Sequence, residues 1–225
     1  MKSKYSILAA ACLLLSICGA YATISEDEAI ENAVATSREA AAQALNAPEY
    51  TWFGLDFTYI KMFGDRGFQK ADSRVQFGWN DLILKEKKKF NAQKAFGKKD
   101  VTYDFEAVGK RNKNVDLESS IVEKVPPQLT QEQISKEVAK LETGDMTGTG
   151  IVFIMELFDK TEKKGYGYMH VVFFDIQSKN VLLSTRMSGK ASGFGKRNFW
   201  INTVYGTLKQ MGGGVYKGLV KKYAK

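Results

Sequence analysis

The fold is decided by three runs near the C-terminus: IVFIMELF (151–158), YGYMHVVFFD (166–175) and NVLLSTRMS (180–188). They are rich in the β-branched and aromatic residues typical of strands. The connections between them, residues 159–165 and 176–179, are too short for the crossover that joins parallel strands. The sequence therefore predicts a β-meander of antiparallel neighbours.

A helix is expected after the meander, because apolar residues from Trp200 to Met211 recur at helical spacing. Gly212-Gly213-Gly214 is expected to stop it, and residues 215–223 to form a last short helical piece.

Before the meander, residues 51–59 alternate between apolar and polar or small side chains, which predicts a half-buried strand. Helical spacing over 75–90, renewed alternation over 101–107 and a helix opened by Thr130 follow, with an irregular stretch at 110–127. The element order is β-α-β-α-β-β-β-α. We expect a single α+β domain at residues 48–225, with a mainly antiparallel sheet and helices packed on one face.

Residues 1–22 have the pattern of a signal peptide. Lys2 and Lys4 precede an apolar run, and Ala20-Tyr21-Ala22 offers the small residues that signal peptidase requires. The mature chain is expected to begin at Thr23 in the periplasm or outside the cell. Export makes nucleotide cofactors and nucleic-acid partners unexpected.

Both cysteines, Cys12 and Cys18, lie inside this segment, so the mature chain has no thiol for a disulfide, a nucleophile or a metal site. The full chain has 33 basic and 25 acidic residues and a formal net charge of +8. Loss of Lys2 and Lys4 leaves 31 basic residues against 25 acidic ones, a net charge of +6.

Residues 23–47 form an N-terminal helix or a tether. Ser25 and Glu28 fit a capping box, and Ala-rich sequence predicts one helix over 26–46. Its apolar stripe is thin, which leaves open whether it docks on the domain or connects it loosely to the export site.

The hairpin VVFFDIQSKNVLL (171–183), together with the element order over residues 51–225, resembles the α+β domain of bacterial envelope lipoproteins of the curli-secretion and penicillin-binding-protein-activator groups. In motif, the similarity covers residues 165–200. Ser178-Lys179-Asn180 stands where those families usually have Thr-Gly. The resemblance implies a binding or assembly role in the cell envelope.

Catalytic chemistry has few candidates. The single histidine, His170, lies within a predicted strand, and we expect it to be buried beside a hydrogen-bond partner, with no metal bound. Asp104 and Glu106 would share one strand face and Glu156 interrupts an apolar strand, so a carboxylate pair of glycosidase type is the alternative. We assign no catalytic residue and expect no cofactor.

Two basic features are candidate binding sites. The glycine-rich stretch before the last long helix lacks the spacing of a phosphate loop, but its backbone N–H groups and cations suit an anion. Its candidate residues are Gly193, Gly195, Lys196 and Arg197. The alternative is that these glycines only make a tight bend.

The second feature is a run of seven lysines in fifteen residues, with Glu86 as the only acid. These lysines are Lys85, Lys87, Lys88, Lys89, Lys94, Lys98 and Lys99. They could contact an anionic envelope surface such as lipid, lipopolysaccharide or acidic glycan, or they could only solvate a helix end.

The sequence thus favours an exported, non-catalytic envelope protein that binds such a surface or an envelope protein. A hydrolase of envelope or environmental polymer is the alternative. A third possibility is a small-ligand carrier, with its pocket between the helices and the aromatic segment 52–63.

Overall fold

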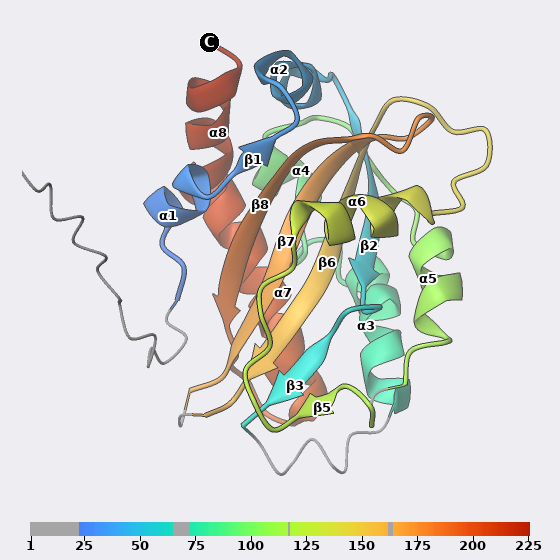
Figure 1. The fold of residues 1–225 in the computed structure, drawn as a ribbon, viewed down its shortest axis with the longest axis vertical. Helices are drawn as coiled ribbons and strands as arrows, with labels where there is room; N and C mark the ends of the chain where they lie inside the picture. Colours follow the sequence, from blue (N-terminus) through green and yellow to red (C-terminus); the bar gives the residue numbers. More distant parts are fainter. Residues whose placement is uncertain (1–22, 65–72, 117, 162–163) are drawn as a thin grey trace, which may run out of the picture.

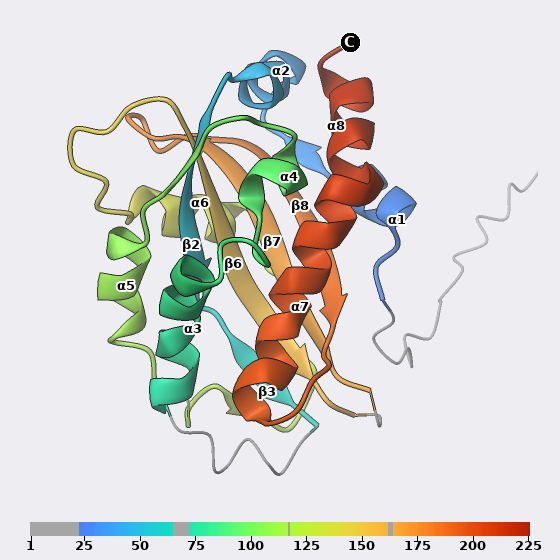
Figure 2. The ribbon, with the colours of Figure 1, turned by 180° about the vertical axis from the view of Figure 1, so that it is seen from behind.

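The computed structural model describes residues 23–64, 73–116, 118–161 and 164–225; among these, the side chains of 73–77 and of Lys196 lie outside the description. The signal peptide expected at 1–22 also lies outside it. The described residues form an eight-stranded sheet, and helices cover both of its faces. Helix α6 (Gln131–Ala139) crosses one face in Figure 1, and α7 (Lys196–Gln210) covers the other in Figure 2.

The predicted meander is confirmed. Strands β6 (Thr149–Asp159), β7 (Tyr166–Asp175) and β8 (Val181–Lys190) are consecutive antiparallel neighbours. Their side chains are almost all buried, because helices pack against both faces.

The sheet as a whole is mixed, so the expectation of a mainly antiparallel sheet with helices on one face was wrong. Strand β2 (Tyr50–Asp56) runs parallel to both β6 and β4 (Val101–Tyr103). The short strand β3 (Lys61–Phe63) runs parallel to β6 and to β5 (Ile121–Val122). These pairings join distant parts of the chain, which a local pattern of hydrophobicity does not record.

Strand β2 is buried on both faces and is therefore not the half-buried strand that its alternation predicted. Trp52 packs against the rings of Phe105 and Phe153, while Phe53 packs against Phe174. Strand β2 lies between β6 and β4, and helices cover both faces of the sheet, which explains this double burial.

Three short helices follow β3 and flank β4: α3 (Ser73–Lys85), α4 (Ala92–Phe96) and α5 (Glu106–Asn112). The strand predicted over 101–107 ends at Tyr103, because α5 begins at Glu106. The helix predicted after Thr130 is confirmed as α6, and Thr130 forms a full capping box with Gln133.

The three glycines after α7 do not stop that helix, contrary to expectation. Residues Met211–Val215 form a π-helix that continues into α8 (Tyr216–Tyr223). A side chain at Gly212 would lie 3.0 Å from the carbonyl oxygen of Lys94 on α4, and the Glu26 carboxylate lies against Gly213 and Gly214. The glycines thus let α4 and the Glu26 side chain pack closely against one continuous helix formed by α7, the π-helix and α8.

The helix predicted over 26–46 is divided into α1 (Glu26–Glu31) and α2 (Arg38–Asn46), with strand β1 (Val34–Ala35) between them. The side chain of Ser37 caps α2, and β1 pairs with β8. The N-terminal segment therefore docks on the domain.

Candidate functional site

The buried acid of the hydrolase alternative, Glu156, is held in an ion cluster. Its carboxylate accepts a hydrogen bond of 2.7 Å from His170 Nε2 and bonds of 3.0 and 2.6 Å from Arg186 Nε and Nη2. Burial alone raises the pKa of Glu156, but the hydrogen bonds from His170 and Arg186 and the charge of Arg186 outweigh it and lower the pKa to about 2. A general acid must hold a proton, so Glu156 is unsuited to that role. His170 is buried and partnered, as expected.

Asp104 and Glu106 are the other two acids of the hydrolase alternative. They do not share a strand face, so that expectation was wrong. Asp104 lies beyond β4, and its Oδ1 accepts a bond of 3.1 Å from the backbone N–H of Glu106. Glu106 begins α5 and pairs with Lys110 at 2.9 Å. The geometry therefore gives the paired-carboxylate alternative no support.

The glycine-rich stretch lies where it was expected, at the start of α7. Gly193 and Gly195 have positive φ angles of 103° and 77°, which only glycine adopts readily. Arg197 is exposed in the first turn, and the side chain of Lys196 lies outside the description.

A groove of about 680 Å³ between α3 and α5 is the nearest match to the carrier hypothesis. Asn80 and Asn112 line it, but both side-chain amides form hydrogen bonds with the backbone of Leu55 in β2. Asn80 Oδ1 accepts from the backbone N–H of Leu55 at 2.9 Å, and Asn112 Nδ2 donates to the carbonyl of Leu55 at 2.8 Å. These amides are part of the fold and are poor candidates for ligand binding.

The structure separates the seven lysines into different roles. Lys98 Nζ donates to the carbonyl of Leu45 at 3.0 Å, near the end of α2, and lies over the rings of Tyr50 and Tyr216. Burial lowers the pKa of Lys98. This lysine therefore fixes α2 in place and is not a free surface cation.

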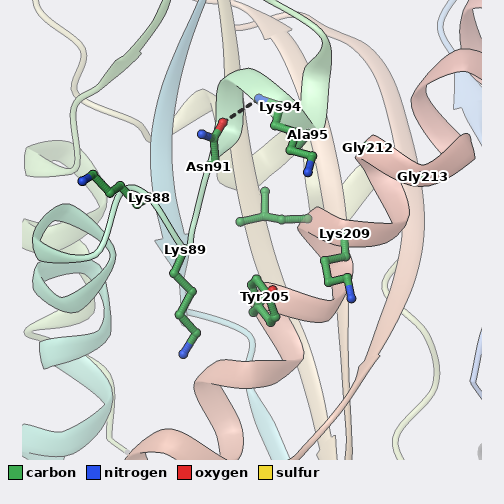
Figure 3. A pocket seen from close by; sticks show the side chains of 10 residues that line it. Lys88, Lys89, Asn91, Lys94, Ala95, Tyr205, Lys209, Gly212 and Gly213 are labelled. Carbon is green, nitrogen blue, oxygen red and sulfur yellow. Dashed lines mark hydrogen bonds between the residues drawn. The ribbon is translucent and has the colours of Figure 1, made fainter.

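Of the remaining lysines, Lys87 has its Nζ 4.8 Å from the centre of the Tyr103 ring. Lys85 and Lys99 are exposed to solvent and do not line the pocket described next. The other three contribute to a pocket of about 350 Å³ between α4 and the end of α7 (Figure 3). A fourth lysine, from α7, completes the set. We call this site the lysine pocket, and its basic residues are Lys88, Lys89, Lys94 and Lys209.

Local structure places the cations. Asn91 caps α4 by accepting a bond of 2.6 Å from the backbone N–H of Lys94, which Figure 3 shows as a dashed line. On α7, Tyr205 and Lys209 are four residues apart and so share a helix face. The ammonium groups of Lys89 and Lys209 lie 5.6 and 5.8 Å from the centre of the Tyr205 ring, on either side of it (Figure 3).

The rest of the lining is neutral. Asn91 and Tyr205 add polar groups, and Ala95, Leu208, Gly212 and Gly213 form apolar or backbone surface. No carboxylate of the described residues lines the pocket; Glu86 lies outside it, 3.9 Å from Lys89. Neighbouring ammonium groups repel one another, so a bound anion would lower the electrostatic free energy of this region.

Sequence reasoning missed the α7 half of the pocket, because it followed only the apolar positions of this helix, from Trp200 to Met211, and did not place Tyr205 or Lys209. A signal was present: residues 176–225 contain ten basic residues and no acid. Tyr205 and Lys209 lie in that stretch at helical spacing, which predicts an exposed basic face.

Within the described ranges, no three His, Cys, Asp or Glu residues form a group able to hold a metal ion. None of the helices built from these residues has the length and apolar character needed to cross a membrane.

No protein-family model matches the sequence, and no curated protein matches it either. Among solved structures, the chain is similar to the hypothetical protein CT253 from Chlamydia trachomatis, with 8% identity and a TM-score of 0.30. That match covers 78% of this chain and 97% of the other.

Proposed function

We propose that this chain is an exported, non-catalytic binding protein of the cell envelope whose lysine pocket takes a small anionic ligand. The observation that carries the proposal is that four lysines from two segments distant in the sequence line one pocket, which no described carboxylate lines. Lys88 points away from the other three in Figure 3, so Lys89, Lys94 and Lys209 carry the argument. Gathering these cations costs free energy through charge repulsion, and a ligand of opposite charge would recover it.

The lining indicates the ligand's chemistry. Lys89 and Lys209 on either side of the Tyr205 ring favour a ligand with more than one anionic group, such as phosphate or carboxylate. Ala95 and Leu208 offer apolar contact for a ring or short chain between those groups. The volume of about 350 Å³ is at the lower end for small-molecule sites, so the bound part is small.

Two observations support an envelope location. Residues 1–22 carry the charged start, apolar run and Ala-Tyr-Ala end of a signal peptide. The resemblance of the 165–200 region to envelope lipoproteins points the same way. Mass spectrometry of the protein expressed in a Gram-negative host should find Thr23 at the mature N-terminus. A lipid on Cys12 or Cys18 would contradict this.

Binding can be tested with pyranine, a fluorescent pyrene that carries three sulfonates, and with tripolyphosphate as its competitor. The double variant Lys89→Gln, Lys209→Gln should weaken pyranine binding about tenfold or more, because it removes two of the four cations. The matched control Lys87→Gln, Lys99→Gln removes equal charge outside the pocket and should change the affinity less than about twofold.

Tyr205→Ala should also weaken pyranine binding, whereas Tyr205→Phe should retain it, because the ring provides the contact surface. Equal losses in the pocket variant and in its matched control would show that pyranine responds only to net charge. That result would contradict the proposal.

A further inference from the structure

A second surface, at the start of α7, has a different character. Phe194 is 95% exposed, whereas the next most exposed large apolar side chain of the described residues, Val34, is 44% exposed. Single exposed apolar residues are common, but a phenylalanine with almost its whole surface in water is not. Its place between Gly193 and Gly195, both at positive φ, makes it project from a tight turn.

The base of this turn is held by hydrogen bonds. The backbone N–H of Ala191 donates to Gly165 O at 2.7 Å, which ties the turn to the start of β7. Ser192 donates its backbone N–H to Phe199 O at 3.1 Å and accepts a bond of 2.8 Å from Asn202 Nδ2 through its carbonyl. Phe194 is therefore presented to solvent from a fixed base.

Exposed cations lie on the segments that flank the turn. Lys190 ends β8, Arg197 lies in the first turn of α7, and Lys164 lies just before β7; all three are exposed. The nearby acid Asp159 is buried and accepts bonds from the backbone and hydroxyl of Thr161, so its charge is engaged within its own turn. We call this surface the Phe194 tip; it consists of Lys164, residues 190–195 and Arg197.

We propose that the Phe194 tip docks on an anionic lipid bilayer, with Phe194 inserted at the boundary between headgroups and acyl chains. Lys164, Lys190 and Arg197 would contact lipid phosphates. A projecting aromatic side chain with exposed cations on the flanking segments combines the two attractions that bring peripheral proteins to membranes. A protein partner would require about 1,000 Å² of complementary surface, which one projecting side chain does not provide.

This docking is independent of the lysine pocket. Arg197 and Lys209 are twelve residues apart on α7, roughly 18 Å along the helix axis at ~1.5 Å per residue. The pocket would thus remain open to solvent while the tip contacts lipid.

Vesicle flotation tests the proposal, with vesicles of phosphatidylcholine alone and of phosphatidylcholine mixed with phosphatidylglycerol. The mature protein should bind the mixed vesicles, and less so as salt is added. Phe194→Ala should weaken this binding about tenfold, because it removes the inserted ring. Val125→Ala, at another exposed apolar residue, should leave binding unchanged.

Phe194→Trp should retain binding, and brominated lipids should then quench fluorescence that they do not quench in the parent protein. Lys190→Gln with Arg197→Gln should weaken binding and reduce its salt dependence. All four variants change exposed side chains, and their thermal unfolding should match the parent.

Four results would overturn the proposal. Three concern the parent protein and Phe194→Ala: absence of binding to mixed vesicles, full binding by Phe194→Ala, and a concentration-dependent dimer in light scattering that Phe194→Ala abolishes. The fourth concerns the lysine pocket. The pocket variant Lys89→Gln, Lys209→Gln should float like the parent. Loss of flotation in that variant alone would assign lipid binding to the lysine pocket and overturn the role of the tip.

Discussion

The two faces of the sheet are stabilised in different ways. Under α4 and α7, aromatic side chains pack edge to face. Phe96 lies within 6.5 Å, between ring centres, of Tyr50, Phe153, Phe173 and Tyr216. Contacts of this kind depend on shape and volume, and no proton or partner charge is needed to maintain them.

Under α6, buried charges meet in two clusters. One is Glu156 with His170 and Arg186. In the other, Arg111 pairs with Asp56 at 3.3 Å and with Glu137 of α6. A buried ion pair is favourable only while both partners are present and charged, so this face is sensitive to the loss of a single charge, whereas the aromatic face is sensitive to changes in side-chain volume.

The largest expected effect is at Glu156. Glu156→Leu leaves the Arg186 guanidinium buried without its main counter-charge and should lower the free energy of unfolding by about 3–5 kcal/mol. Adding Arg186→Met should recover most of that loss, because two apolar side chains can replace a buried pair. Urea denaturation measures both values. A double variant as unstable as Glu156→Leu would show that the cluster is not a self-contained pair.

Acid should act through the same residue. The pKa of Glu156 is about 2 in the folded protein and near 4.5 when unfolded. The contribution of ionised Glu156 to the free energy of unfolding is thus complete above about pH 4.5. It is lost as the pH falls towards 2, to a total of about 3 kcal/mol. The Glu156→Leu, Arg186→Met double variant should lose less stability over this range. Parallel pH profiles for the two proteins would contradict the assignment.

On the other face, close packing predicts a smaller loss. A methyl group at Gly189 of β8 would clash with the backbone carbonyl of Thr203 on α7, so Gly189→Ala should cost about 1–3 kcal/mol. Gly109→Ala is the control: nothing lies near that position on α5, and alanine there should stabilise the helix by up to ~1 kcal/mol. Equal effects of the two variants would show that α7 does not pack tightly on the sheet.

The smallest effect concerns the start of α6. Thr130→Ala removes the side-chain acceptor for the backbone N–H of Gln133 and should cost about 1 kcal/mol, whereas Thr130→Ser should retain stability. Because α6 is also anchored by Glu137, the helix should remain folded in Thr130→Ala. Loss of helical circular dichroism would mean that the cap, and not the ion cluster, holds α6 in place.

Local and long-range features of the sheet differ in how well the sequence predicts them. The β-branched and aromatic content of β6 to β8 and their short connections are local features, so the meander was predictable, as was α6 from Thr130. The parallel pairing of Thr51 with Gly150 is not local, and the mixed sheet was therefore missed. Glu156 was noticed as an acid in an apolar strand, but only the fold brings Arg186 to it.

The candidate site was predicted in part for the same reason. Lysine density identified Lys88, Lys89 and Lys94, yet the same density suggested Lys98, which the fold uses against Leu45. Lys209 joins the pocket only through the packing of α7 against α4. Composition therefore identifies a basic region, whereas tertiary structure decides which cations line one pocket.

The parallel pairing of β2 with β6 has a consequence for the order of folding. Thr51 finds its partner Gly150 only after about a hundred further residues have been made, and until then β2 can pair only with the three-residue strand β4. Contacts of such long range form slowly, so the N-terminal half of the chain should remain unfolded while the rest is synthesised. The export that we propose would benefit from this delay, because the chain stays open until β6 has been made.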